Sequence, residues 1–125
     1  MSNSLLEKLI GPFYDVTGVD HRLQVSVDTV RQLVRQHQLL GCPTAEGTLV
    51  FPTSQFDEGG APLVGLAEVV ATLAVGTNDP WQVALWLTTP SEQLRGRAPV
   101  DALRRGQNEA VRRVACQTAE RWRQR

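Results

Sequence analysis

The chain has 125 residues, which is enough for one domain or for two very small ones that share a core. Apolar residues (42%) and charged residues (21%) are near ordinary globular levels, which argues against a disordered chain. Thirteen basic and thirteen acidic residues cancel, which argues against a simple polybasic nucleic-acid binder.

Helices are expected in the first forty residues. Apolar residues at helical spacing between Leu5 and Ile10 predict a first helix, which stops at the glycine–proline pair 11–12. A second short apolar stretch covers residues 13–19. Ser26 is suited to cap a further helix, which has an apolar stripe on one side and polar residues on the other.

Two short extended runs, residues 39–42 and 48–51, follow this capped helix. Gly47 lies between them and supplies the backbone freedom that a hairpin turn needs. Pro43 and Pro52 cannot donate ladder hydrogen bonds, so we expect the hairpin to be an exposed edge or wing and not a central strand.

The second half of the chain is expected to be purely helical beyond a glycine-rich linker at residues 57–62. Four helical segments are predicted, over residues 63–76, 80–89 and 99–106 and from about 107 onward. An aspartate–proline pair begins the second segment, a proline begins the third, and the last has the most regular apolar stripe.

No residues form a pattern that predicts catalysis or metal binding. His21 and His37 lie in polar stretches without a neighbouring nucleophile, and no phosphate-binding or metalloprotease motif occurs. Cys42 and Cys116 have neither a CxxC spacing nor a nearby histidine pair. We therefore expect no enzyme activity, no metal and no cofactor. No stretch approaches the roughly 20 apolar residues of a membrane span, and no signal peptide is evident, so a cytoplasmic protein without membrane contact is expected.

The helix, turn, capped helix and hairpin together have the outline of a winged helix-turn-helix. The polar side of the capped helix carries residue types that contact base edges and phosphates. The candidate DNA-binding residues are Thr29, Arg31, Gln32, Arg35 and Gln36. Such side chains are also common on helix faces that merely contact solvent. Residues 1–56 carry four basic and five acidic groups, so this module alone is expected to bind DNA weakly.

A spaced series of residues occupies the second half of the chain: Trp86, Leu87, Pro90, Leu94, Gly96, Pro99, Leu103, Gly106, Glu109 and Val111. The series resembles the pattern W-L-x-x-P-x-x-x-L-x-G-x-x-P-x-x-x-L-x-x-G-x-x-E-x-V of the toxin-binding domain of Xre/MbcA/ParS-like antitoxins. The resemblance covers about residues 63–122. Residues 39–56 also look like the winged segment that precedes this domain in some bacterial relatives.

This resemblance implies a small helical domain that docks on a RES-domain toxin and often contributes to oligomerisation. It also implies a chain that is not itself catalytic and that commonly represses its own operon. The candidate partner-binding residues are Trp81, Trp86, Leu87, Pro90, Leu94, Arg95, Arg97 and Arg105. The two tryptophans cannot share one stripe of a short helix, which favours a partner surface, although a small core is at least as good an explanation. The chain departs from the family in its hairpin and in Ala98, where a serine or threonine cap is usual.

The charge is unevenly distributed along the chain. Residues 1–94 hold four basic and ten acidic groups (net −6), whereas residues 95–125 hold nine arginines and three acidic groups (net +6). Each of those three acids has an arginine three or four residues further on, at ion-pair spacing. Arg95, Arg97, Arg121 and Arg125 have no such acid. We expect the basic end of the chain to face a protein partner first and DNA phosphate second.

The sequence thus predicts a mainly α protein, with a winged helix-turn-helix and its short β-hairpin in residues 1–57. A small helical toxin-binding and oligomerisation domain is predicted in residues 62–125. The leading hypothesis is an antitoxin-like homo-oligomer that neutralises a RES-type toxin and represses its own operon on operator DNA. One alternative is a stand-alone DNA-binding regulator whose second domain serves self-association. Another is a protein-interaction adaptor that no longer binds DNA.

Overall fold

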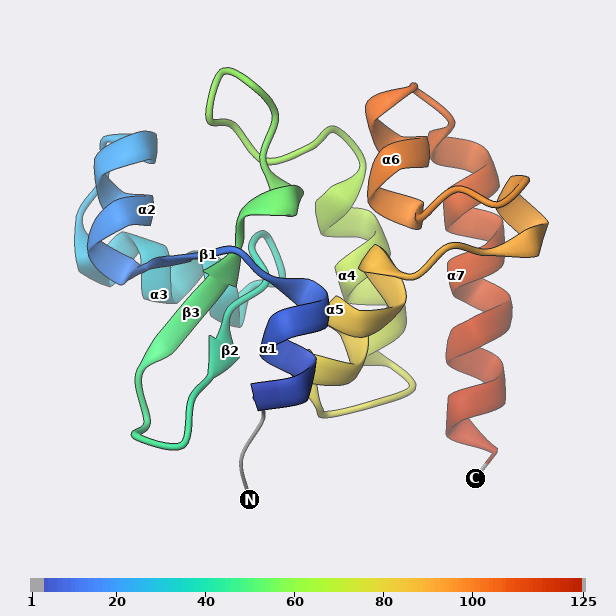
Figure 1. The fold of residues 1–125 in the computed structure, drawn as a ribbon, viewed down its shortest axis with the longest axis horizontal. Coiled ribbons are helices and arrows are strands. Elements are labelled where there is room, and N and C mark those ends of the chain that lie inside the picture. Colours follow the sequence, from blue (N-terminus) through green and yellow to red (C-terminus); the bar gives the residue numbers. More distant parts are fainter. Residues whose placement is uncertain (1–3, 125) are drawn as a thin grey trace.

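The computed structural model describes residues 4–124, in which seven α-helices accompany a small antiparallel sheet (Figure 1). The mainly α class is confirmed. None of the described helices is both long and apolar enough to cross a membrane. The elements are α1 (Ser4–Ile10), β1 (Phe13–Asp15), α2 (Val16–Leu23), α3 (Val27–Arg35), β2 (Cys42–Pro43), β3 (Leu49–Pro52), the 3₁₀ turn η1 (Thr53–Gln55), α4 (Leu66–Ala74), α5 (Pro80–Thr88), the 3₁₀ turn η2 (Glu92–Leu94), α6 (Pro99–Arg104) and α7 (Asn108–Arg123).

The sheet has the strand order β1–β3–β2, so β3 is its central strand. Tyr14 of β1 lies opposite Phe51, and Cys42 of β2 lies opposite Val50. The prediction of a hairpin with no central strand is therefore wrong. Proline is tolerated in β3 because Pro52 is the last residue of the strand, where few ladder bonds remain to be made. The hairpin turn itself is confirmed.

Helix α2 and strand β1 both lie within or just beyond the apolar stretch 13–19. Asp15 caps α2, since its carboxylate accepts a hydrogen bond of 2.7 Å from the backbone N–H of Gly18. The helix ends at Gln24, which has a left-handed backbone with φ of 57°. Ser26 then caps α3 as predicted, because its hydroxyl accepts a 3.1 Å bond from the N–H of Thr29. Only three residues, 24–26, separate the two helices.

Two clusters of buried side chains form the core. The smaller cluster joins α2, α3 and β3, and consists of Val19, Val30, Leu39, Phe51 and Phe56. The larger cluster is built from α4, α5, α6 and α7, but Ile10 of α1 and Cys42 of β2 also belong to it. Helix α1 packs against α5. The first helix of the chain was expected in an N-terminal domain of residues 1–57, and it packs with the helices of the second half instead.

The two clusters meet along the hairpin. The indole N–H of Trp81, in α5, donates a 2.8 Å hydrogen bond to the carbonyl oxygen of Pro43 in β2. The ring of Phe13, in β1, meets the same indole edge-on with 5.8 Å between ring centroids. One buried tryptophan side chain therefore joins the helices of the larger cluster to two strands of the sheet.

A buried glutamine fixes the base of the hairpin. The side chain of Gln55 is 1% exposed, and its amide donates to the carbonyl oxygens of Leu40 (2.9 Å) and Pro52 (3.2 Å). Its side-chain oxygen accepts a 2.9 Å bond from the N–H of Leu40. A buried amide of this kind is stable only when its donors and acceptor are paired, and here each is.

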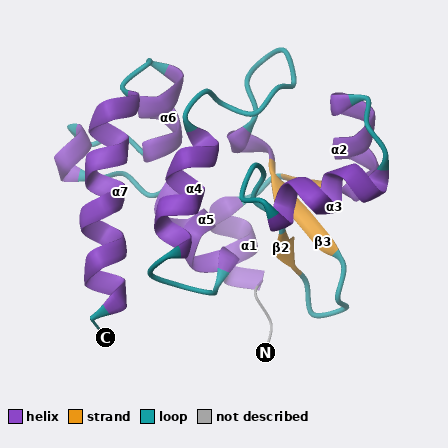
Figure 2. Ribbon diagram, turned by 180° about the vertical axis from the view of Figure 1, so that it is seen from behind, coloured by secondary structure: helices purple, strands orange, loops and turns teal. Residues whose placement is uncertain are grey.

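The elements are spread along one long axis. Helices α2 and α3 lie at one end of this axis, α6 and α7 at the other, and α4 and α5 between them (Figure 1). Seen from behind, α3 runs beside β2 and β3, and the loop between these strands projects away from the body (Figure 2). Helix α4 packs on α7. At the end of α4 the two backbones are so close that a Cβ on Gly76 would lie 2.5 Å from the carbonyl oxygen of Ala119.

Candidate nucleic-acid interface

One side of α3 is polar and exposed. Val30 on its inner side is buried in the smaller cluster, and Leu33 and Val34 pack against that cluster. The opposite side turns to solvent because this helix alternates apolar and polar residues with a period near 3.6. The exposed residues of that side are Asp28, Arg31, Gln32, Arg35 and Gln36. The structure therefore brings four of the five predicted DNA-binding residues together on one accessible surface.

Thr29 is the exception among the predicted residues. It is half-buried, and its hydroxyl lies 2.9 Å from the hydroxyl of Ser26. Since the Ser26 side chain also accepts from the Thr29 N–H, both groups of Thr29 take part in the N-cap. Its role in the structure is to begin α3, and its hydroxyl is not free on the polar side of the helix.

Arg22 of α2 is an exposed arginine that the sequence did not single out. The guanidinium of Arg22, in α2, lies 4.8 Å from the centroid of the Tyr14 ring, within cation–π distance. Arg22 is exposed, and its guanidinium also lies beside Gly60 in the loop before α4. No helix was predicted from the sequence at this position, so nothing in the residue pattern distinguished Arg22 as a candidate.

The loop of the hairpin is compact and carries a negative charge at its tip. The backbone N–H of Thr44 donates a 2.7 Å bond to the carbonyl oxygen of Thr48, and the two hydroxyls lie 2.8 Å apart. Gly47 completes the turn with φ of 87°, a conformation that glycine adopts without strain. Glu46 is exposed at this tip. A carboxylate there disfavours contact with phosphate.

The predicted partner-binding residues divide into buried and accessible ones. Trp81, Leu87 and Leu94 are at most 4% exposed and belong to the larger cluster, so their burial removes them from any surface that a partner touches. Trp86 packs against this cluster and is half-buried, as is Arg97. Those that remain exposed are Pro90, Arg95 and Arg105.

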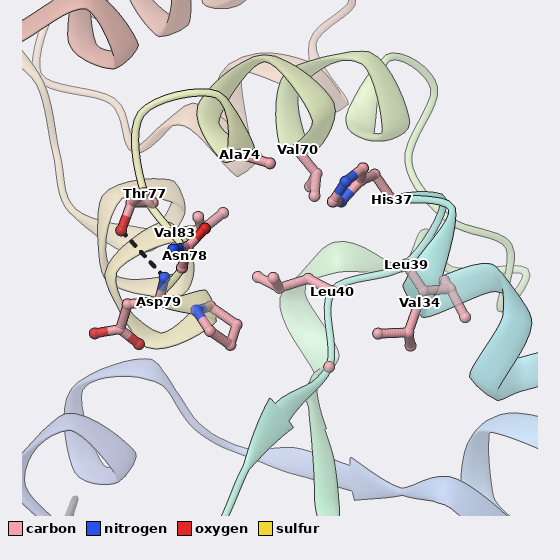
Figure 3. A pocket seen from close by; sticks show the side chains of 12 residues that line it. Val34, His37, Leu39, Leu40, Val70, Ala74, Thr77, Asn78, Asp79 and Val83 are labelled. Carbon is pink, nitrogen blue, oxygen red and sulfur yellow. Dashed lines mark hydrogen bonds between the residues drawn. The ribbon is translucent and has the colours of Figure 1, made fainter. Parts of the chain in front are cut away.

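A cavity of about 330 Å³ lies between the end of α3 and helices α4 and α5 (Figure 3). Apolar side chains, among them Leu40 and Val70, line its middle, with Asn78 at one end and His37 at the other. The dashed line in Figure 3 is the 3.1 Å bond from the N–H of Asp79 to the Thr77 hydroxyl. Leu39 of the smaller cluster and Val70 of the larger one both line this cavity, so it lies where the two clusters adjoin.

The described residues hold no grouping of three histidine, cysteine or acidic side chains suited to a metal ion. Cys42 and Cys116 are free thiols. Burial, and to a lesser degree the nearby Asp79 carboxylate, raises the pKa of the Cys42 thiol to about 12. This thiol stays protonated at neutral pH and is a poor nucleophile, whereas Cys116 is exposed on α7.

The three acids of the basic segment form the ion pairs that their spacing predicted. Asp101 pairs with Arg104 at 2.9 Å, Glu120 pairs with Arg123 at 3.8 Å, and Glu109 pairs with Arg112. The hydrogen bond and charge of Arg112 lower the pKa of the Glu109 carboxyl. Each of these pairs is solvent-exposed, so its main effect is to occupy one arginine. Arg125, also predicted to lack an acid, lies outside the described residues.

Comparison with known proteins gives one structural likeness. No family model matches the chain, and no curated protein matches it. The fold is similar to that of the NMR structure of Rv2175c, with 29% sequence identity and a TM-score of 0.75. The similarity covers 86% of this chain and 81% of that one. The similarity therefore extends over most of both chains and is not confined to one short motif.

Proposed function

We propose that this chain is a DNA-binding regulator in which α2 and α3 form a helix-turn-helix and the β2–β3 hairpin forms its wing. The observation that carries the proposal is the exposed polar side of α3, which follows α2 after a three-residue turn. Arg31, Gln32 and Arg35 lie on this helix, and Gln36 is its C-cap residue. An α-helix fits the major groove, and arginine and glutamine side chains donate hydrogen bonds to base edges there.

The smaller cluster supports this proposal because it packs α3 against α2 and β3. Val30 is fully buried and points away from the polar side. A recognition surface on a packed helix keeps its side chains in register, which base readout requires. The β2–β3 loop projects away from the body (Figure 2), which leaves it accessible as a wing.

The test begins by selecting bound duplexes from a pool of random-sequence DNA with the full chain, followed by sequencing. We expect an enriched motif. Arg31→Ala and Arg35→Ala should each weaken binding to an enriched duplex by about 5- to 150-fold, the range for loss of one base-reading arginine. Asp28→Asn is a matched control on the same helix face, and it should leave binding unchanged or strengthen it. Equal binding of all duplexes by the wild type, with no effect of either arginine, contradicts the proposal.

The antitoxin hypothesis adds a toxin partner and repression of the chain's own operon. Its support is the residue pattern between Trp86 and Val111, several members of which are buried in the larger cluster. An apolar series of this kind also serves a core, so the pattern carries less weight than the polar side of α3. Co-expression with a RES-domain toxin tests it, since a stable complex on a sizing column is expected and separate elution contradicts it.

A further inference from the structure

Three arginines of the basic end, Arg95, Arg113 and Arg121, lie around a hydrogen bond that joins η2 to α7. Gln117 of α7 accepts a 3.0 Å hydrogen bond from the side-chain amide of Gln93 in η2. Arg113 and Arg121 lie four residues before and after Gln117, on the same stripe of α7. Arg95 follows η2 directly. The Gln93–Gln117 bond thus brings the loop after η2 beside this stripe of the helix.

We call this surface the arginine face and define it by Arg95, Arg97, Arg113 and Arg121. Arg95, Arg113 and Arg121 are exposed and Arg97 is half-buried. None of the four takes part in an ion pair within the described residues, because Asp101, Glu109 and Glu120 pair with other arginines. Glu92 of η2 is the acid nearest in sequence to Arg95, and it forms no ion pair in the same residues. The four arginines therefore outnumber the free acid of this surface.

We propose that the arginine face binds the phosphate backbone of DNA without regard to sequence, and supplies attraction that the α2–α3 unit lacks. The proposal rests on the proposed DNA-binding function. Residues 1–56 carry a net charge of −1, so α3 brings base-reading side chains but little overall attraction to a polyanion. Phosphate contacts position a protein on DNA, while base contacts specify the site. In this chain the two tasks would fall to opposite ends.

The composition of the arginine face favours a polyanion over a protein partner. Protein interfaces usually have an apolar or aromatic centre that is fully covered in the complex. The large apolar side chains that are exposed in residues 4–124 are Leu5, Leu9, Val64 and Val75, all outside residues 91–124. Guanidinium groups, by contrast, match phosphate oxygens with two parallel hydrogen bonds. A surface of arginines and glutamines with no exposed apolar centre has the properties of a phosphate-binding surface.

The two surfaces belong to opposite ends of the long axis, which would place their contacts on separate stretches of DNA backbone. A compact chain of this length has a radius of gyration of about 14 Å, and thus spans roughly one turn of B-DNA. Helix α3 lies at one end of the long axis and α7 at the other (Figure 1). When α3 occupies a major groove, the arginine face is therefore remote from the bases that α3 reads.

The test uses the full chain and a random-sequence duplex of about 24 base pairs, with fluorescence anisotropy at KCl concentrations from about 50 to 300 mM. The variant carries Arg95→Gln, Arg113→Gln and Arg121→Gln together. Each phosphate that the variant no longer neutralises reduces the steepness of log affinity against log salt by about 0.9. We expect a decrease of up to about 2.7 and at least tenfold weaker binding at about 50 mM salt.

A matched control removes the same charge from arginines that already pair with acids, through Arg104→Gln, Arg112→Gln and Arg123→Gln. For this control, the steepness of log affinity against log salt should fall by less than about 1 relative to the wild type. The reason is that these guanidiniums are already partly neutralised by their acids. Replacing the three face arginines by lysine should restore most of the wild-type slope. Circular dichroism checks that each variant is folded.

The proposal is overturned when the folded face variant keeps the wild-type slope, or when the control lowers it as much as the face variant does. Capture of an acidic protein by the face, with DNA affinity unchanged, is such an outcome. A different result would contradict the proposed function alone. In that result, Arg31→Ala and Arg35→Ala leave the affinity for an enriched duplex unchanged, while the face variant still shows a shallower dependence of log affinity on log salt.

Discussion

The two ends of the molecule differ in core, charge and surface. The α2–α3 end has a small cluster centred on Val30 and Phe51, a net charge of −1 over residues 1–56, and a polar helix side. The α4–α7 end has the larger cluster and carries the arginine-rich segment. The end that would read bases is therefore neither the one with the larger core nor the more basic one.

The position of α3 consequently depends on contacts made by the other end. A small cluster buries little apolar surface, and burial is the main source of stability. Trp81 and the hairpin residues Leu40 and Cys42 connect the smaller cluster to the larger one. Gln55 connects the hairpin to η1. Changes at these residues are the direct way to separate the two ends experimentally.

The largest effect is expected for Trp81→Ala. Removing the buried indole leaves a cavity and an unpaired Pro43 carbonyl, which should lower the free energy of unfolding by about 3–5 kcal/mol. Urea unfolding followed by circular dichroism measures the loss. In hydrogen exchange, amides of α3 and β3 should lose more protection than those of α7. Trp81→Phe keeps an aromatic ring beside Phe13 and should lower the free energy of unfolding by less. Equal losses of hydrogen-exchange protection in α3 and α7 would contradict the dependence of α3 on this contact.

A smaller loss is expected for Gln55→Leu. The substitution keeps a side chain of similar size but leaves the N–H and carbonyl of Leu40 buried without these partners, which should cost about 2–3 kcal/mol in unfolding free energy. Gln93→Leu provides a comparison, because it removes an exposed glutamine that bonds only to Gln117. Its cost should stay below about 0.5 kcal/mol. Similar stabilities for the two variants would show that the hairpin base does not need Gln55.

The third effect is a dependence of stability on alkaline pH. Burial raises the pKa of Cys42 from 9.0 to about 12, so the unfolded chain loses this proton at a lower pH than the folded chain does. The protonated Cys42 thiol therefore adds to the free energy of unfolding. This contribution is fully present below pH 9 and decreases as the pH rises toward 12, by up to about 1.4 kcal/mol per pH unit. Urea unfolding between about pH 8 and 10.5 measures it, and Cys42→Ala should have a shallower slope. Parallel slopes would show that the thiol is not responsible.

The helical half could be predicted well because its end signals are local. Asp79 caps α5 through the N–H of Trp81, at 3.0 Å, and α6 begins at Pro99 without a side-chain cap, as Ala98 implied. The helix α2 could not be predicted in the same way. It has eight residues, Gly18 weakens its pattern, and its cap, Asp15, is also the last residue of β1.

The candidate sites were predicted unevenly for a related reason. The polar side of α3 follows from periodicity within one helix, so the exposure of Arg31 and Arg35 could be predicted. The roles of Leu87 and Leu94 depend on which neighbouring helices cover them, and an apolar residue at regular spacing suits a core and a partner surface equally. The role of Gln55 could not be predicted from the residue pattern, because its hydrogen-bond partners are backbone groups of Leu40 and Pro52.

The separation of charge along the molecule also has a kinetic consequence. Residues 95–125, with a net charge of +6, include α6 and α7 at one end of the long axis, while the segment before them carries −6. Such a chain has a large electric dipole, and a dipole experiences a torque in the field of a polyanion before contact is made. The molecule would approach DNA with α7 foremost and bring α3 to the groove second. Added salt would shorten the range of this alignment, so it would slow association more than it would speed dissociation.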